Sequence, residues 1–312
     1  MSNFYVYRKT LLFSLFQFLV DIACLLIVIG LATAGFFIMN KPDDSTNAFI
    51  GLGVGLLIGL VITILIGYFV TNRIKAAQIA MMAKGVTEES LPEHTIKAGF
   101  KEIKGRFGKI TLFFVLTNAI KSVFRQMGRG INRLGTAVGG QVGNTVTSVV
   151  DSAIQTLVGY LIDCCLAWVF YRSDINGFKA GCEGAVIFFK HGKTLFRNIG
   201  RIFGMGLLSF ILVGGGLTGI FYLVLSNFPN LLQPLLGEIG TDDIRMVAFV
   251  IAAFIGVIIW SILHRVLVRP FILVGVMRNF MKAGKEHVPS EADMAELSSK
   301  YPRFSKLQSR AE

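Results

Sequence analysis

Long apolar runs alternate with short polar segments along this chain, and the runs have the length that a membrane-spanning helix requires. About 20 consecutive apolar residues cross the hydrocarbon core of a bilayer as an α-helix. The predicted spans cover residues 11–39, 49–70, 152–171, 202–226 and 246–265. This pattern predicts an all-α fold, a polytopic transmembrane helix bundle with about four to six spans.

The first run is expected to remain in the protein as a membrane helix. Arg8 and Lys9 precede it, as basic residues precede the apolar core of a cleaved signal peptide. The run 11–39 is, however, much longer than the roughly 7–15 apolar residues of such a core.

The composition agrees with a protein that exposes apolar surface to lipid. Hydrophobic residues make up 53% of the chain, charged residues make up 16%, and the mean hydropathy is +0.64. A soluble domain typically carries about 25% charged residues. The few polar groups present here would not cover the surface of a globular protein in water.

The basic residues predict how the chain is oriented in the membrane. The net charge is +12, and Lys and Arg concentrate at the N-terminus, in 71–110, in 172–201 and near the C-terminus. The loops 40–48 and 227–245 contain one Lys or Arg each. Under the positive-inside rule both termini are cytosolic, and anionic headgroups of the cytosolic leaflet are the expected lipid partners. No nucleic-acid-binding motif accompanies the charge, so nucleic acid is not an expected partner.

We expect residues 1–277 to form one polytopic membrane domain, followed by a charged cytosolic tail over 278–312. Within the domain, 172–201 interleaves Lys and Arg with phenylalanines. That pattern is typical of an amphipathic helix at the headgroup boundary, where basic side chains reach water and aromatic rings are buried. The predicted fold therefore includes basic amphipathic interfacial helices.

The stretch 110–150 decides the number of spans. The segments 71–110 and 172–201 are both predicted to be cytosolic, so an even number of crossings must lie between them. The basic residues of the stretch recur every four positions and are Lys121, Arg125, Arg129 and Arg133. Such spacing places them on one helical face. The stretch is either amphipathic or re-entrant at the cytosolic surface, or it spans with its basic face in a wet interior, because a charge at the bilayer centre costs about 2.5–3.5 kcal/mol.

Glycines at four-residue spacing predict places where helix backbones approach closely. The glycines in this pattern are Gly51, Gly55, Gly59, Gly135, Gly139, Gly143, Gly215 and Gly219. They are expected to pack helices of the same chain together or, alternatively, to form a homo-oligomer. The run Gly214-Gly215-Gly216 would weaken a helix and is expected to mark a kink or an unwound segment.

Charged residues within or near the predicted spans are candidates for a transport site, and they are Asp163, Asp21, Arg265 and Arg269. Asp163 is deep in 152–171, where a carboxylate must pair, face water or be protonated. It is expected either to bind a cation or proton or to hold helices together through an ion pair, with Arg265 or Arg269 as a hypothetical partner. Asp21 is interfacial if the first span begins near residue 22. The two arginines could equally reach the cytosolic surface.

No complete catalytic, cofactor or metal motif is present in the sequence. The four cysteines form no C-x-x-C pair and no Cys/His spacing typical of zinc. Gly192-Lys193-Thr194 resembles the end of a P-loop, but residue 187 is not the glycine that this motif requires. We therefore expect no enzyme activity, no cofactor and no metal.

One segment resembles a known family. Residues 177–185 read GFKAGCEGA, and residues 196–201 read FRNIGR ahead of a glycine-containing run. Together with 268–284 they are similar to the C-terminal half of choline-transporter-like proteins, over residues 177–284. This resemblance implies transport of choline or a related cation. It assigns no substrate-binding residue in this chain, and the large extracellular loop of that family is absent here.

These observations predict an integral membrane protein that mediates transport or permeation of a small solute or lipid. The basis is the deep Asp163 and the glycine breaks. The alternative is a non-catalytic membrane scaffold or assembly subunit that acts through its glycine-rich helix faces. Transport predicts that flux depends on Asp163, whereas a scaffold predicts that changing the glycines to leucine abolishes association.

Overall fold

The computed structural model is helical over the residues that it describes, which are 1–39, 45–88, 90–107, 112, 115–126, 144–196, 199–228 and 241–311. The chain divides into two compact units. Unit 1 contains Met1–Leu195 and Leu273–Glu312, and unit 2 contains Phe196–Ile272. This division differs from the predicted single membrane domain over residues 1–277.

Four helices among the described residues are long and apolar enough to cross a membrane, which confirms the predicted all-α, multi-pass class. They are Asn3–Met39, Thr46–Thr87, Gly204–Asn227 and Arg245–Glu286. In the most apolar window of each, only 6 to 17% of the residues are buried inside the protein. Apolar surface of this extent is stable against lipid tails and unstable against water.

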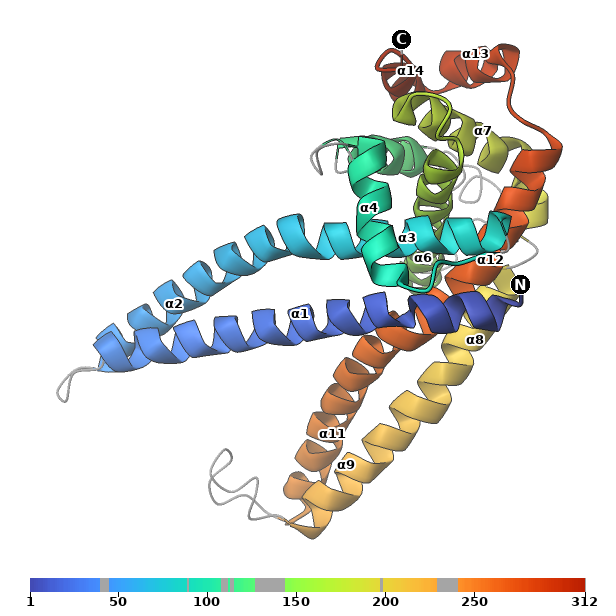
Figure 1. Ribbon diagram of the computed structural model, residues 1–312. Coiled ribbons are helices and arrows are strands. Elements are labelled where there is room, and N and C mark those ends of the chain that lie inside the picture. Colours follow the sequence, from blue (N-terminus) through green and yellow to red (C-terminus); the bar gives the residue numbers. More distant parts are fainter. Residues whose placement is uncertain are drawn as a thin grey trace. The chain divides into compact units, whose positions relative to one another are not determined.

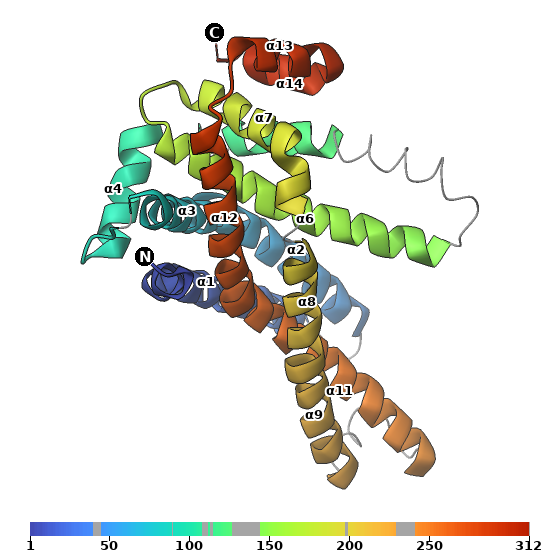
Figure 2. The same cartoon turned by 90° about the vertical axis from the view of Figure 1, so that its right-hand side faces the viewer.

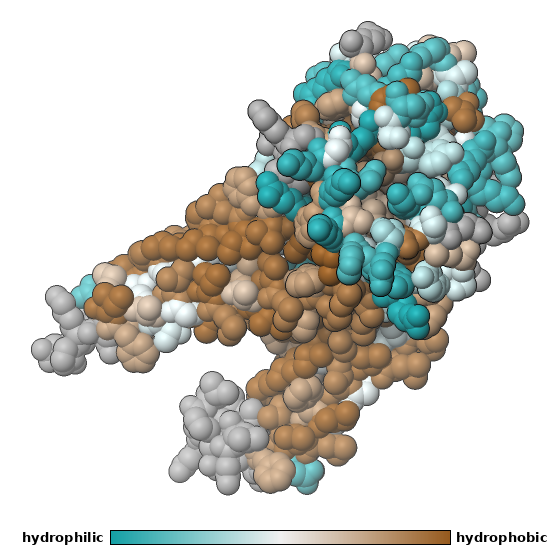
Figure 3. Space-filling view, in the orientation of Figure 1, coloured by the Kyte–Doolittle hydropathy of each residue, from teal (hydrophilic) through white to brown (hydrophobic). Residues whose placement is uncertain are grey.

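Unit 1 begins with a long helical hairpin (Figure 1). Its first arm is α1 (Asn3–Met39), and its second arm is one continuous helix made of α2 (Ser45–Ile66), the π-helical η1 (Gly67–Thr71) and α3 (Asn72–Thr87). The surface along α1 and α2 is mostly hydrophobic, whereas the helices that follow carry much of the hydrophilic surface of this unit (Figure 3).

The two arms of this hairpin meet backbone to backbone at three glycines of α2. A Cβ built on Gly51 would overlap the carbonyl of Gly35, and one on Gly55 would overlap the carbonyl of Leu31. A Cβ on Gly59 would lie 2.9 Å from a backbone Cα of α1. The predicted glycine face therefore lies at a contact within the chain, and Gly35 is the matching small residue on α1.

Unit 2 is a second hairpin, and both of its arms contain a π-helical segment. The first arm consists of α8 (Ile199–Ser209), η2 (Phe210–Gly215) and α9 (Gly216–Asn227). The second arm consists of α11 (Thr241–Leu263), η4 (His264–Val268) and the start of α12 (Arg269–Glu286). The sequence predicts a kink or an unwound segment at Gly214-Gly215-Gly216. The structure has the π-helical η2 there, which ends at Gly215.

The arms of unit 2 pack through Gly256, and not through the predicted pair Gly215 and Gly219. A Cβ on Gly256 would lie 3.0 Å from the backbone nitrogen of Thr218. A Cβ on either Gly215 or Gly219 would meet nothing within 4 Å. Among the described residues no helix packs against this pair, because four-residue spacing aligns glycines on a face without determining which face meets a neighbour.

Beyond its hairpin, unit 1 is a bundle of shorter helices packed around α6 (Figure 2). These helices are α4 (Thr95–Phe107), residues 115–126, α6 (Asn144–Tyr171), α7 (Gly177–Phe196), the C-terminal part of α12, α13 (Glu291–Lys300) and α14 (Pro302–Gln308). Gly184 of α7 lies against Cys165 of α6, and Gly284 of α12 lies against Trp168 of α6. Small residues thus let α7 and α12 approach the central helix closely.

Protein, and not lipid, covers the apolar end of α6, although the sequence predicts a span over 152–171. Every residue from Tyr160 to Phe170 is at most 6% exposed. The apolar helix Val158–Tyr171 is shorter than the four candidate spans and is not among them.

The C-terminal segment is folded as far as residue 311, although the sequence predicts a charged tail over 278–312. Ser290 caps α13, since its Oγ accepts a hydrogen bond from Asp293 N and its own N donates to Asp293 Oδ2. The apolar residues of α13 and α14 are buried, and they are Met294, Leu297, Phe304 and Leu307. These helices therefore belong to the packed bundle.

The acidic residues of α13 neutralise lysines of α7 that the sequence predicts at the headgroup boundary. Lys179 Nζ lies 2.5 Å from Glu291 Oε1, and Lys190 pairs with Asp293. The hydrogen bond from Lys190 lowers the pKa of Asp293 to about 2. The α7 helix is amphipathic as predicted, and its two lysines pair with protein carboxylates while their side chains stay 40% and 44% exposed.

Part of the predicted basic face of 110–150 can be placed. Lys121 and Arg125 are exposed on the helix 115–126, while Val123 and Phe124 of the same helix are buried. The remaining predicted residues lie outside the described part of the chain, and they are Arg129, Arg133, Gly135, Gly139 and Gly143. The helix is therefore amphipathic at Lys121 and Arg125, which both alternatives for 110–150 predict.

We expect Gly55→Leu to destabilise the protein and Gly53→Leu to leave it nearly unchanged. The side chain at 55 would collide with the backbone of α1, whereas nothing lies within 4 Å of a Cβ at 53. Overpacking of this kind costs about 1–3 kcal/mol or more. Thermal unfolding of the purified variants in detergent measures the difference. Equal effects of the two substitutions would show that the glycine contact does not hold the hairpin.

Candidate functional site

A row of polar side chains lies on the face of α1 that packs against the second arm of the hairpin. Its members are spaced i, i+4, i+7 and i+11, and they are Thr10, Ser14, Gln17 and Asp21. Such spacing places them on one helical face. Thr10 and Ser14 are buried, and Gln17 and Asp21 are half-buried. We call these four residues the polar row.

The N-terminal end of the polar row is satisfied by hydrogen bonds to neighbouring groups. Gln78 of α3 donates from Nε2 to Ser14 Oγ at 2.7 Å and to Thr10 O at 3.4 Å. Thr10 donates from Oγ1 to Val6 O at 2.9 Å. These bonds tie α1 to α3 and leave no buried donor of Gln78 unused at this end.

Two buried polar groups of the hairpin are not satisfied, one within the polar row and one farther along on α2. Gln17 Nε2 and Thr63 Oγ1 of α2 are buried, and neither has a hydrogen-bond partner within the described residues. An unmade hydrogen bond at a buried group costs about 1–3 kcal/mol. Inside a bilayer no lipid tail can supply the missing partner. These two groups can therefore bind a polar molecule that enters the hairpin.

The antiparallel register places Asp21 close to the start of η1. Gly59 of α2 lies beside Val28 of α1, and farther along Gln78 contacts Ser14. Asp21 lies between these two points, and the corresponding position on the second arm is the beginning of the π-helical segment.

This register gives a depth for Asp21 in the membrane. The first cation of the second arm is Arg73, two residues after η1 ends. If Arg73 marks the edge of the hydrocarbon, a rise of 1.5 Å per residue puts Asp21 about 6–10 Å inside it. On that basis Asp21 lies within the span, whereas the alternative at the interface requires the hydrocarbon to begin near residue 22.

The helix opposite Asp21 has an altered hydrogen-bond ladder. In η1, Asn72 N donates to Gly67 O, five residues back, and Asn72 Nδ2 donates to Tyr68 O at 3.2 Å. Single π-helical turns inside α-helices frequently occur at functional sites. A membrane carboxylate and a disturbed ladder therefore face the same part of the hairpin.

Asp163 lies in the bundle of unit 1 and not in one of the four candidate spans. It is 1% exposed, and its Oδ1 lies 2.7 Å from Lys75 Nζ of α3. The lysine side chain is about one-third exposed, at 34%. This ion pair joins α6 to α3, which agrees with the helix-holding alternative for Asp163.

Arg265 and Arg269 belong to unit 2, whereas Asp163 belongs to unit 1. Arg265 is exposed within η4, and Arg269 is half-buried at the start of α12. The cation that the structure places beside Asp163 is Lys75. An ion pair between Asp163 and either arginine stays a prediction.

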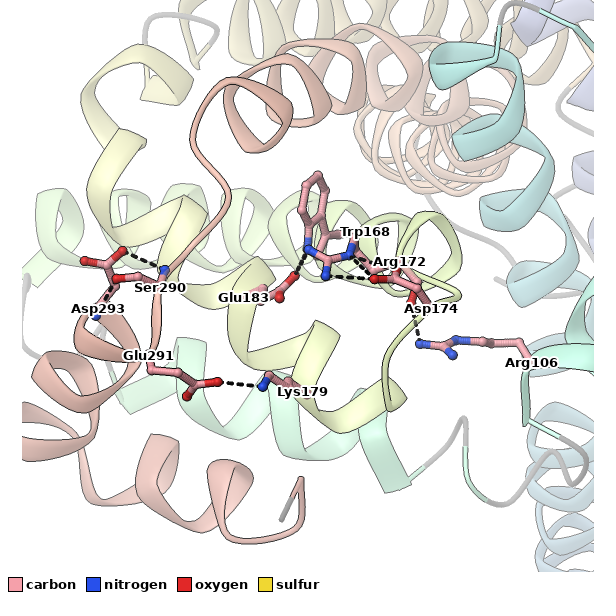
Figure 4. Close-up of polar contacts among 9 residues, drawn as sticks. All are labelled: Arg106, Trp168, Arg172, Asp174, Lys179, Glu183, Ser290, Glu291 and Asp293. Atoms are coloured by element: carbon pink, nitrogen blue, oxygen red, sulfur yellow. Dashed lines mark hydrogen bonds and ion pairs between the residues drawn. The ribbon is translucent and has the colours of Figure 1, made fainter.

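A second polar cluster joins α6 to α7 at the centre of the bundle (Figure 4). Glu183 is buried, and its Oε2 accepts from Trp168 Nε1 at 2.9 Å and from the Arg172 guanidinium at 3.0 Å. Arg172 also donates to Asp174 at 2.9 Å. Burial raises the pKa of the Glu183 carboxyl, while the bonds from Trp168 and Arg172 oppose that rise.

The same cluster closes the end of α6. Arg106 of α4 donates to the carbonyls of Val169, Arg172 and Ser173, at 3.0, 2.9 and 3.4 Å. A guanidinium at this position satisfies carbonyls that end a helix and opposes the negative end of its dipole. The cluster pairs its charged groups with one another, so we assign it a structural role.

The cysteines offer neither a metal site nor a reactive thiol in the described part of the chain. All four are buried and not in disulfides. Burial raises the pKa of Cys182 to about 12, which keeps its thiol protonated and unreactive at neutral pH. The described residues contain no group of three His, Cys, Asp or Glu side chains that could hold a metal ion.

The polar row is visible in the sequence, although only one of its members, Asp21, is among the residues predicted for the site. The four members recur at helical spacing inside a run that hydropathy averages as apolar, so their common face is visible without a structure. The unsatisfied Thr63, the partner Gln78 and the ion-pair partner Lys75 carry no such signal, because each depends on which helix lies opposite.

Comparisons with protein-family models, with curated proteins and with solved structures find no match for this chain. The similarity of residues 177–284 to choline-transporter-like proteins therefore stays a prediction.

We expect Lys75→Met to destabilise the protein more than Asp163→Asn. Removing the lysine leaves a carboxylate buried without this cation, whereas Lys75 can turn to water once the aspartate is neutral. We expect a loss of about 2 kcal/mol for Lys75→Met, less than for a fully buried pair because the lysine is partly exposed. Thermal unfolding of both single variants and of the double variant measures this.

In that experiment the double variant should recover most of the stability that Lys75→Met loses. Strict additivity of the two substitutions would contradict the ion pair.

Proposed function

We propose that this chain is a transporter of a small cation or polar solute, and that the polar row of α1 is its binding site within the membrane. The observation that carries the proposal is that two buried groups of the hairpin, Gln17 Nε2 and Thr63 Oγ1, are unsatisfied, and that they lie on either side of Asp21 in the hairpin register. Polar and ionisable residues inside a bilayer are costly and typically mark solute or ion pathways.

The chemistry of the site favours a cation or a neutral solute over an anion. Asp21 supplies negative charge, Gln17 supplies amide donors, and Thr63 supplies a hydroxyl that both donates and accepts. An anion would meet repulsion from the carboxylate. This preference agrees with the choline-like cation that the family resemblance implies, although it rests on different residues.

The polar row explains how a solute is bound, but it does not form a complete pathway across the membrane. A two-helix hairpin has one mutual face, and the rest of its surface is apolar and exposed. The polar row ends where the glycine contact between α1 and α2 begins, so polar groups line only one half of the span. Further helices must complete the pathway during transport.

Asp21→Asn and Thr63→Val should each reduce flux about tenfold or more, the effect of losing roughly 1.4 kcal/mol of binding. Flux of radiolabelled choline and of protons, the latter with a trapped pH dye, can be measured in proteoliposomes. The matched control is Thr33→Val, because Thr33 is exposed on α1 and outside the polar row.

Two results would contradict this function. One is that the folded wild-type protein moves neither probe above the level of empty liposomes. The other is that Asp21→Asn and Thr63→Val transport as well as Thr33→Val does.

A non-catalytic membrane scaffold is the second candidate, and one observation favours it. Gly215 and Gly219 form a small-residue face on the second hairpin that no described residue of the chain packs against. Glycines at this spacing permit a close approach by another helix. The most apolar window of the span that carries them is only 6% buried. A second copy of this chain is the simplest occupant of that face.

If the scaffold candidate is correct, Gly219→Leu should weaken self-association about tenfold. Gly53→Leu is the matched control, since that glycine also faces open space but lies in the other hairpin. The dissociation constant of the dimer can be measured by fluorescence energy transfer between labelled copies in liposomes. A protein that stays monomeric at all densities would contradict this candidate.

A further inference from the structure

A groove lies between the start of α1 and the first turn of α4 in unit 1. Its volume is about 720 Å³, which is within the range of ligand pockets, about 300–1,000 Å³. Arg8, Lys9 and Leu12 line it from α1, and Thr95 and Lys97 line it from α4. Neither the polar row nor the Glu183 cluster contributes to it.

We infer that this groove binds the phosphate of an anionic lipid headgroup. Three cations line it, Arg8, Lys9 and Lys97, and the opposing carboxylate in the lining is Glu93. Arg8 and Lys97 are exposed, and Lys9 is half-buried. Basic pockets beside membrane helices on the cytosolic side are typical sites for phosphate-bearing lipid headgroups.

The first turn of α4 adds backbone donors to these cations. Ala98 N donates to His94 O at 3.0 Å, and this bond begins the ladder of the helix. The amides of Thr95, Ile96 and Lys97 come before it and have no acceptor within the helix. All three of these residues line the groove. Such amides, together with the positive end of the helix dipole, favour an anion.

The groove lies at the level of the headgroups and not in the aqueous phase. Leu12, which is 50% exposed, opens the apolar run of α1. Arg8 and Lys9 precede Leu12 by three to four residues, a rise of about 4.5–6 Å along the helix. The headgroup region extends roughly 5–7 Å beyond the hydrocarbon. A lipid with its tails along α1 would therefore bring its phosphate to Arg8 and Lys9.

This site is independent of the proposed transport function, because no residue of the polar row lines the groove. It also differs from the basic face of α7, whose lysines pair with α13. The sequence predicts contact with anionic headgroups in general. The groove adds a defined position at which one such lipid binds.

Native mass spectrometry of the full-length protein in detergent tests the assignment, with phosphatidylglycerol and phosphatidylcholine as the added lipids. We expect one preferred phosphatidylglycerol adduct. Arg8→Gln and Lys97→Gln should each weaken it about fivefold. The matched control is Lys104→Gln, an exposed lysine of α4 outside the groove, and this variant should bind as the wild type does.

Glu93→Gln gives a test of the opposite sign that does not depend on losing a cation. Removing the opposing carboxylate should strengthen phosphatidylglycerol binding, by about twofold to fivefold. Equal binding of the two lipids, or equal losses for Lys97→Gln and Lys104→Gln, would overturn the site. Stabilisation by inorganic phosphate with no response to phosphatidylglycerol would overturn its assignment to a lipid.

Discussion

The backbone contact between α1 and α2 is the constraint on which the rest of unit 1 depends. At Gly51 and Gly55 the two helices are so close that any side chain would strike a carbonyl of the other arm. These helices cannot slide by one residue, because a large neighbour of these glycines, such as Leu52 or Val54, would then meet the backbone of α1. The register is therefore fixed at one end of the hairpin, and the continuous second arm carries it through η1 to α3. The bond from Gln78 to Ser14 and the position of the headgroup groove both follow from that register.

The second arms of the two hairpins are built alike: each is a long helix that is apolar and exposed at first and packs in the protein core afterwards. Thr46–Thr87 and Arg245–Glu286 are each 42 residues long, and each contains a π-helical segment near its middle. Before the segment most side chains are apolar and exposed, and after it the helix becomes part of the protein core. In the first arm, for example, most residues from Ile74 to Val86 are buried. A rigid helix that changes its surroundings from lipid to protein must change its surface at the boundary, and the π-helical turn marks that place in both arms.

The sequence predicts the spans and one of the helix contacts, and it fails where the answer depends on what covers a segment. Run length alone identifies the four long apolar helices, because lipid imposes a minimum length. Hydropathy measures transfer out of water and does not distinguish lipid from protein as the apolar surrounding. The run 152–171 is therefore predicted as a span, although α3, α7 and α12 cover its residues 160–170. The same limit applies to Asp163, since Lys75 is visible as its partner only when α3 is known to lie beside α6. Within the candidate site, the spacing of the polar row could be read from the sequence, but the unsatisfied Gln17 and Thr63 could not.

Whether protein or lipid surrounds a helix also determines which carboxylate a transported solute can reach. Asp163 is 1% exposed and already neutralised by Lys75, so a solute could reach it only by opening the bundle. Asp21 is half-buried on a helix whose outer faces meet lipid, and a polar row leads to it from the end of the hairpin where the headgroup groove lies. Three cations at that end would repel a cationic solute over a Debye length of about 8 Å. An anionic lipid in the groove would cancel that repulsion, because its phosphate lies among the same cations. A cation site inside this hairpin and an anionic lipid at its mouth are therefore electrostatically compatible.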